Sequence, residues 1–211
     1  MNYLKMAERA LKLLHKSLPA LQMGNNVLFV PPVEHILRCF TLETHLSTKG
    51  EAYFWRVVMP LYRPPCFLVL NYADRLLGGE RVSLRESDLD RTIDRLARVA
   101  SQGEFEYLKR IQSPRDFLQQ IDWGGRPGSP NYLLDRALTQ YMTGDVSACL
   151  EILGQVVSAQ FSPRWAESVA LARDLVEELK ANPFAFDQRI RAWEERNIAG
   201  LHLKPRARRR L

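Results

Sequence analysis

The first apolar residues of the chain recur at spacings of three and four. Ala7, Leu11 and Leu14 fall on one side of a helical projection of residues 3–18, and the charged residues fall elsewhere. This spacing is typical of an amphipathic α-helix with one buried face. Pro19 ends the predicted helix, because the residue before a proline is biased towards extended backbone.

The pattern changes between Val27 and Leu70, where β-branched and aromatic residues concentrate. Such runs are typical of β-strands. We predict strands at residues 27–30, 34–43, 52–61 and 66–71. Because their connections are short, neighbouring strands are expected to pair antiparallel.

The alternation within these strands is incomplete. One face of residues 53–61 carries Tyr53 and Trp55, and the other carries Phe54 and Arg56. A sheet with one solvated face would instead alternate apolar and polar residues. The first helix covers one face only, so we expect the C-terminal helices, another subunit or a partner to cover the second face.

Gly78-Gly79 is interpreted as a hinge or linker, and helical periodicity follows it. Ser-Pro and Asn-Pro pairs mark four helix starts. The Ser or Asn side chain accepts a hydrogen bond from an otherwise unpaired amide of the first turn, and Pro at the next position has no amide that would need a partner. Ser113 with Asp116 resembles a capping box. Beyond a helix capped by Ser87 or Asp88 and a short helix near residues 107–111, the predicted helices cover residues 114–121, 130–142, 146–159, 163–180 and 184–198.

A tight turn at Gly144-Asp145 joins two of these helices into an αα-hairpin. Residues 132–153 resemble the helix-turn-helix of tetratricopeptide-type repeats, but no second copy follows at a spacing of about 34 residues. A repeat and a generic hairpin both stay open.

These elements predict an α+β fold. An N-terminal helix precedes an antiparallel meander of three to four strands, and a C-terminal bundle of about six helices follows, including the αα-hairpin. We divide the chain into residues 1–79 (helix and sheet), residues 84–203 (helices packed on the sheet) and residues 204–211 (basic tail).

The positive charge of the chain is concentrated in this tail. The net charge of +6 falls to +1 without the last eight residues, whose basic members are Lys204, Arg206, Arg208, Arg209 and Arg210. A globally basic nucleic-acid-binding surface is therefore not supported, although the tail itself is a candidate for contact with nucleic acid.

Three scattered cysteines favour a reduced, cytoplasmic setting. No apolar run reaches the roughly 18 residues that span a bilayer, so no membrane partner is expected.

Motifs of catalysis are missing from the sequence. It contains no G-x-S-x-G, no H-E-x-x-H, no phosphate loop and no Cys/His cluster, so we expect no metal and no cofactor. The glycine-rich loop of residues 123–131 holds Arg126 ahead of a helix that starts at Ser129. These two residues are a candidate anion-binding site, because helix N-termini attract anions, and the alternative is a flexible connector. An enzyme that acts on an anionic substrate at this loop is a third functional option.

Two arginines interrupt apolar strands. Arg38 and Arg56 must either extend to solvent or pair, and acidic residues stand at the strand ends. A structural ion pair is one interpretation. The other is a protein-binding surface that includes Arg38, Trp55, Arg56 and Tyr62, because Arg, Trp and Tyr are enriched at interface cores.

The runs Ile36–Glu43, Tyr53–Tyr62 and Leu68–Tyr72 resemble uncharacterised bacterial proteins. The layout of residues 1–80 is similar to the small α+β immunity proteins of bacterial toxin systems. This resemblance implies a non-enzymatic protein that neutralises a toxin by occlusion, or an adaptor, with no catalytic residues. The expected partner is another protein. The alternative is a nucleic-acid-associated factor that acts through the tail, and homo-oligomerisation stays open.

Overall fold

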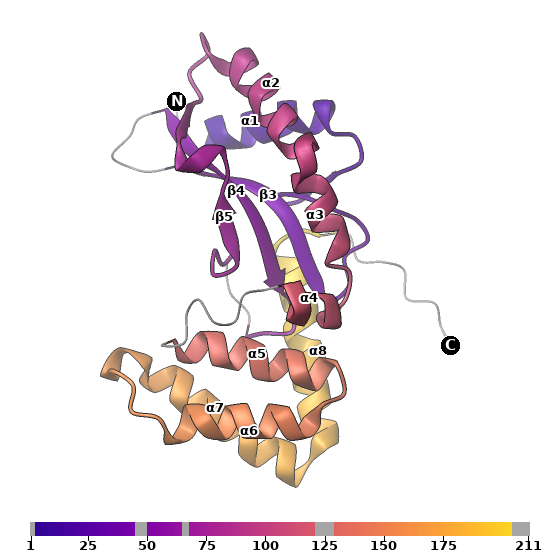
Figure 1. Cartoon of the computed structure of the whole chain (residues 1–211), viewed down its shortest axis with the longest axis vertical. Coiled ribbons are helices and arrows are strands. Elements are labelled where there is room, and N and C mark those ends of the chain that lie inside the picture. The colour runs from indigo at the N-terminus through magenta and orange to yellow at the C-terminus, as the bar shows by residue number, and fades with distance from the viewer. Residues whose placement is uncertain (1–2, 45–49, 65–67, 121–128, 204–211) are drawn as a thin grey trace. The chain divides into compact units, whose positions relative to one another are not determined.

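The computed structural model describes residues 3–44, 50–64, 68–120 and 129–203 of the chain, and the α+β fold predicted from the sequence is confirmed. Figure 1 shows the order of the elements. The chain forms two compact units. Residues 1–59, 67–111 and 198–211 make up the sheet unit, and residues 60–66 and 112–197 make up the helical unit.

The sheet unit begins with α1 (Tyr3–Ser17) and contains a six-stranded sheet in the order β1-β2-β3-β4-β5, with β6 also on β4. The register shows β1 antiparallel to β2, β2 to β3, and both β5 and β6 to β4. The strands are β1 (Gln22–Met23), β2 (Leu28–Phe29), β3 (Ile36–Thr44), β4 (Glu51–Pro60), β5 (Ala73–Arg75) and β6 (Arg81–Ser83).

The prediction of a strand at residues 66–71 is wrong for residues 68–71, the part that the structure describes. Residues 68–70 lie outside any strand, and pairing resumes where the Val58 amide donates to the Tyr72 carbonyl at 3.0 Å. The apolar run of Leu68–Leu70 therefore belongs to the connection, and the register that opposes Val57 to Ala73 fixes the strand after it.

Gly78-Gly79 does not separate sheet from helices. These glycines form the turn η1 (Leu77–Gly79) with positive φ angles of 64° and 82°, between two strands that both pair with β4. The sequence missed β6 because a three-residue strand carries too little alternation to predict. The two units divide at other points, and the helices α2 and α3 belong with the sheet.

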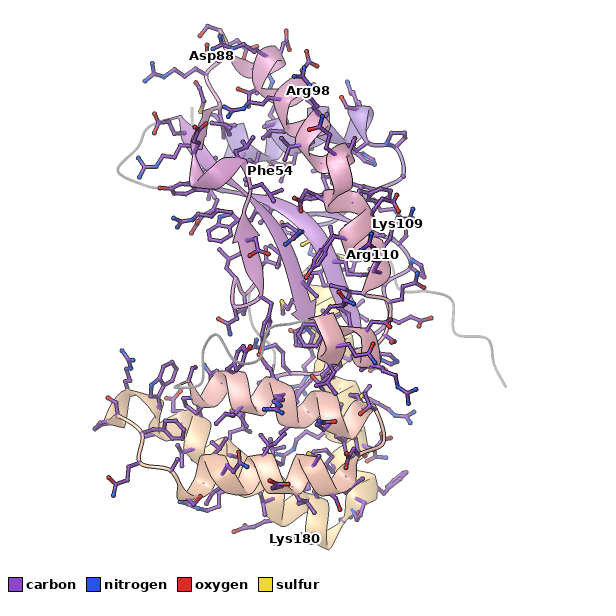
Figure 2. The ribbon with its side chains drawn as sticks, in the orientation of Figure 1. Phe54, Asp88, Arg98, Lys109, Arg110 and Lys180 are labelled. Atoms are coloured by element: carbon purple, nitrogen blue, oxygen red, sulfur yellow. The ribbon has the colours of Figure 1, made fainter. Side chains whose placement is uncertain are left out.

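Helices α2 (Leu89–Val99) and α3 (Phe105–Arg110) flank a kinked turn, η2 (Ala100–Glu104), where Gly103 has a φ of 104°. Both α1 and α3 lie against β3, and α1 also contacts α2. On β3 every residue from Ile36 to Leu42 is buried, so within this strand both faces of the sheet are covered. Phe54, which is labelled in Figure 2, belongs to this core. Its ring stacks on that of Phe40, with the ring centroids 5.5 Å apart.

Most of the predicted helices form in the helical unit. They are α4 (Pro114–Gln120), α5 (Pro130–Met142), α6 (Val146–Ser158), η3 (Pro163–Trp165), α7 (Ala166–Ala181) and α8 (Pro183–Gly200). The residues of α8 after Asn197 belong to the sheet unit. The capping box is confirmed, because the Asp116 carboxylate accepts from the Ser113 amide at 2.9 Å and Ser113 Oγ accepts from the Asp116 amide at 3.2 Å. Asp145 caps α6, and α5 packs on α6 as the predicted αα-hairpin.

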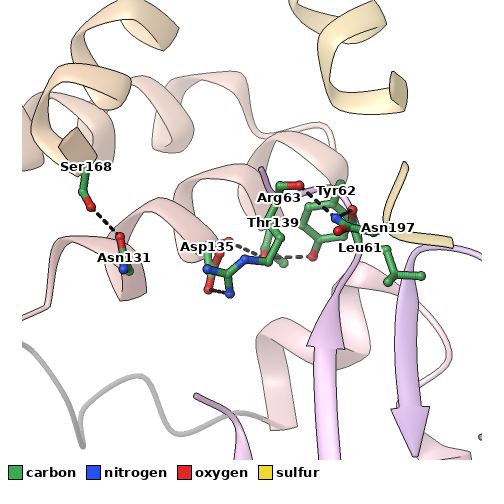
Figure 3. A network of polar contacts seen from close by, with 8 residues as sticks. All are labelled: Leu61, Tyr62, Arg63, Asn131, Asp135, Thr139, Ser168 and Asn197. Carbon is green, nitrogen blue, oxygen red and sulfur yellow. Dashed lines mark hydrogen bonds and ion pairs between the residues drawn. The ribbon is translucent and has the colours of Figure 1, made fainter. Parts of the chain in front are cut away.

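Buried polar contacts hold the segment after β4 within the helical unit (Figure 3). Tyr62 shares a hydrogen bond of 2.9 Å with Thr139, and Arg63 pairs with Asp135 at 2.9 Å. The Asn197 amide donates to the carbonyls of Leu61 at 2.7 Å and of Arg63 at 3.0 Å. Helix α5 thus binds Tyr62 and Arg63, and α8 binds Leu61 and Arg63, in each case through buried side chains of the helix.

Among the residues that the structure describes, no helix combines the length and the apolarity that crossing a bilayer requires.

Candidate protein-binding face

Arg38 does not belong to an exposed binding surface. Its side chain sits in β3 with the residue 4 % exposed, and Nη2 donates to the carbonyls of Val30 and Pro32. Two main-chain oxygens thus accept hydrogen bonds from this buried guanidinium. The role of Arg38 is to bind the chain that leads from β2 into β3.

Tyr62 is also removed from the candidate surface, because it is fully buried in the helical unit against Thr139. Burial raises the pKa of the Tyr62 hydroxyl far above its ordinary value, so this hydroxyl stays protonated and neutral.

Arg56 lies at a cluster of charges on one face of β4. Its guanidinium pairs with Asp74, its cross-strand neighbour on β5, and with Glu104 at the end of η2. The same guanidinium lies 3.8 Å from the ring centroid of Tyr107 in α3. With a side chain only 17 % exposed, Arg56 fastens α3 to the sheet. The structural ion pair considered from the sequence is therefore present, with Glu104 as a partner that the sequence did not suggest.

The opposite face of β4 is the half-exposed one. Ala52 and Phe54 are buried, whereas Glu51, Tyr53 and Trp55 are partly exposed. This alternation holds in the first half of β4 and ends at Val57, after which both faces are buried. Along β4, the second face is therefore incompletely covered at Glu51, Tyr53 and Trp55 and is buried from Val57 onwards.

Two arginines of the neighbouring strands lie over these aromatic rings. The Arg75 guanidinium lies 4.0 Å from the ring centroid of Tyr53 and 4.7 Å from that of Trp55. Arg81 lies 5.1 Å from the Tyr53 centroid, and its Nε donates to Tyr53 Oη at 2.9 Å. The strand register explains these contacts between arginines and aromatic rings, because Trp55 lies opposite Arg75 and Tyr53 lies opposite Arg81.

Two carboxylates complete this set, which we call the arginine–aromatic face (Glu43, Glu51, Tyr53, Trp55, Arg75 and Arg81). Trp55 Nε1 donates to Glu43 Oε2 at 2.9 Å, and Arg81 Nη1 lies 3.6 Å from Glu51 Oε2. The hydrogen bond to Tyr53 raises the pKa of Arg81. The rings are therefore oriented by polar contacts while part of their surface stays open to solvent.

The sequence identified Trp55 but missed Arg75 and Arg81. Tyr53 and Trp55 alternate visibly along the strand, yet their cationic neighbours depend on the register of two three-residue strands. A signal was present, because Arg75 and Arg81 flank Gly78-Gly79 at nearly equal distances, as expected for residues brought back beside one strand by a turn.

The remaining candidates lie mostly beyond the part of the chain that the structure describes. Arg126 and the tail residues Lys204, Arg206, Arg208, Arg209 and Arg210 are outside it. Ser129 precedes α5 with extended backbone, and its side chain makes no capping hydrogen bond to the helix. Within residues 3–44, 50–64, 68–120 and 129–203, no group of three His, Cys, Asp or Glu side chains could hold a metal ion.

The comparisons with known proteins give no family. No protein-family model matches the chain, and no curated protein or solved structure is significantly similar to it. What the arginine–aromatic face does must therefore be argued from its own chemistry. Half-exposed Tyr and Trp with stacked Arg can bury apolar area and supply N–H donors to one ligand.

Proposed function

We propose that the protein is a non-enzymatic protein-binding module whose contact surface is the arginine–aromatic face. The observation that carries this proposal is the pair of partly exposed rings, Tyr53 and Trp55, beneath arginines from β5 and β6. Tyr, Trp and Arg are the residues that contribute most binding energy at protein interfaces.

The rigidity of this face favours the same conclusion. Trp55 is fixed by Glu43 and Tyr53 by Arg81, so little side-chain entropy is lost when a partner docks. Without the tail, the sheet unit holds 15 Lys and Arg against 12 Asp and Glu, a mild excess that suits an acidic partner surface. Such a module acts by occlusion, and the toxin-neutralising role implied by the resemblance above is one form of it.

A double substitution tests the proposal. Tyr53→Thr with Trp55→Thr keeps β-propensity on the strand and removes both rings. The matched control is Trp165→Thr in the helical unit, since Trp165 is also half-buried and lies 5.0 Å beneath an arginine, Arg164.

The assay is affinity capture by the full chain from a lysate of its source organism, followed by mass spectrometry and titration calorimetry with each captured protein after purification. We expect one protein to bind the wild type and the Trp165→Thr chain directly, and to bind the double variant at least about 30-fold more weakly, as two lost interface aromatics imply. If a correctly folded double variant binds every purified partner as tightly as the wild type does, this face is not the interface and the proposal fails.

A further inference from the structure

Arg75 is the cation of the arginine–aromatic face that two rings hold in place. Its guanidinium lies over both Tyr53 and Trp55, and its residue is exposed. Within the described part of the chain, no carboxylate oxygen lies within 4.0 Å of its nitrogen atoms as an ion pair. The Arg75 side chain is therefore positioned by the two aromatic rings and not by an internal ion pair.

The carboxylates near Arg75 are already engaged by other groups. Glu43 accepts from Trp55 Nε1, and Glu51 faces Arg81. Asp74 precedes Arg75, but strand alternation turns it to the opposite face, where it pairs with Arg56. The charge of Arg75 thus has no counterpart of its own among these three carboxylates.

Stacking leaves the most useful part of a guanidinium available. Arg75 Cζ lies over both rings, and the five N–H donors of a guanidinium all lie in its own plane. A carboxylate that approaches edge-on accepts two parallel hydrogen bonds in this geometry. The rings also shield one side of the new ion pair from water, which strengthens it.

We infer that Arg75, seated on Tyr53 and Trp55, is the anchor that binds an Asp or Glu side chain of an acidic protein segment. This inference rests on the proposed function and names the chemistry of its partner. A carboxylate fits better than a phosphate, because Glu43 and Glu51 lie on the same face and would repel a doubly charged group more strongly.

The test follows the Nε–Hε resonance of Arg75 and the indole Nε1–H resonance of Trp55 by NMR in the ¹⁵N-labelled full chain. The Trp55 resonance also reports binding in the variants that lack Arg75. The ligand is acetylated, amidated tetraglutamate, and inorganic phosphate is titrated separately at the same ionic strength. We expect a saturable shift of the Arg75 resonance with tetraglutamate. Arg75→Lys, which keeps the charge but loses the planar donors, should bind about tenfold more weakly, and Arg75→Gln should not bind measurably.

Arg164→Gln is the matched control, because Arg164 also stacks on an aromatic ring but belongs to the helical unit. It should leave tetraglutamate binding unchanged. The inference is overturned if no saturable shift is seen, if Arg75→Gln binds as the wild type does, or if phosphate binds more tightly than tetraglutamate.

The two proposals fail in different ways. If a purified protein partner is lost by the double variant at Tyr53 and Trp55 but retained by Arg75→Gln, the face binds protein and the role of Arg75 is wrong. If neither variant weakens any purified partner, the proposed function itself fails.

Discussion

Asn197 is the residue through which α8 holds the segment after β4, and replacing it tests the buried network of the helical unit (Figure 3). Its amide donates to two main-chain carbonyls, those of Leu61 and Arg63, and the Asn197 residue is 2 % exposed. Asn197→Ala removes both donors and leaves two buried oxygens with fewer partners. Each buried polar group left unsatisfied costs about 1–3 kcal/mol, so we expect a loss of about 2–4 kcal/mol in the free energy of unfolding.

Asn197→Asp separates hydrogen-bond donation from shape. Aspartate has nearly the same volume as asparagine, but its ionised carboxylate cannot donate and would face two carbonyl oxygens. At neutral pH this variant should therefore be at least as destabilised as Asn197→Ala. The difference from wild type should shrink as the pH falls and the carboxyl becomes protonated, because the protonated group regains one donor.

The control lies in the same unit and the same figure. Asn131 Oδ1 accepts one hydrogen bond from Ser168 Oγ at 2.6 Å, and that contact is only partly buried. Asn131→Ala should cost about 1 kcal/mol. Urea unfolding followed by far-UV circular dichroism measures all three variants. If Asn197→Asp loses no more stability than Asn131→Ala, the two carbonyls do not depend on the Asn197 amide and the reasoning is refuted.

Two further predictions concern the thiol in α6 and the basic tail. Burial raises the pKa of Cys149 to about 12, whereas the unfolded thiol ionises near its ordinary value of about 8.5. The stability that the protonated Cys149 thiol contributes is therefore complete below about pH 8.5 and is lost as the pH rises towards 12. Cys149→Ala should flatten the decline of the unfolding free energy above pH 8.5 by up to about 1.4 kcal/mol per pH unit. Equal slopes for the variant and the wild type would contradict this. Deleting residues 204–211 should leave capture of the protein partner unchanged, because the arginine–aromatic face lies on β3, β4, β5 and β6. Salt-dependent binding of an oligonucleotide that disappears with this deletion would instead support the nucleic-acid alternative.

The helices could be predicted from the sequence because their ends are encoded locally. Ser113 with Asp116, and Asp145 before α6, form the capping contacts that their spacing indicates. A cap needs only residues within one turn of each other, so no knowledge of the tertiary structure is required. The long strands β3 and β4 could also be predicted, because each is a run of mostly apolar, β-branched and aromatic residues that a single arginine interrupts.

The candidate site could be predicted only in part, because it depends on register. Trp55 could be identified from the alternation along its strand. The surroundings of Arg38 could not, because its contacts with the carbonyls of Val30 and Pro32 depend on the path of the chain from β2 into β3. Likewise, Arg75 becomes a neighbour of Trp55 only once β5 has paired with β4. Long-range pairing of this kind leaves no short-range pattern in the sequence.

The division of the chain into units has a consequence for the order in which the protein is made. The sheet unit includes residues 198–203, where the Leu201 carbonyl accepts a hydrogen bond of 3.0 Å from the Asn25 amide. A Cβ on Gly24 would lie 2.9 Å from the same carbonyl oxygen, so the two segments are closely packed. The segment around Asn25 therefore lacks this contact until Leu201, about 175 residues later in the chain, has left the ribosome. Co-translational folding of the sheet unit stays incomplete until then. The helical unit depends on the same late stretch of chain, because Asn197, whose amide donates to the Leu61 and Arg63 carbonyls, directly precedes residues 198–203.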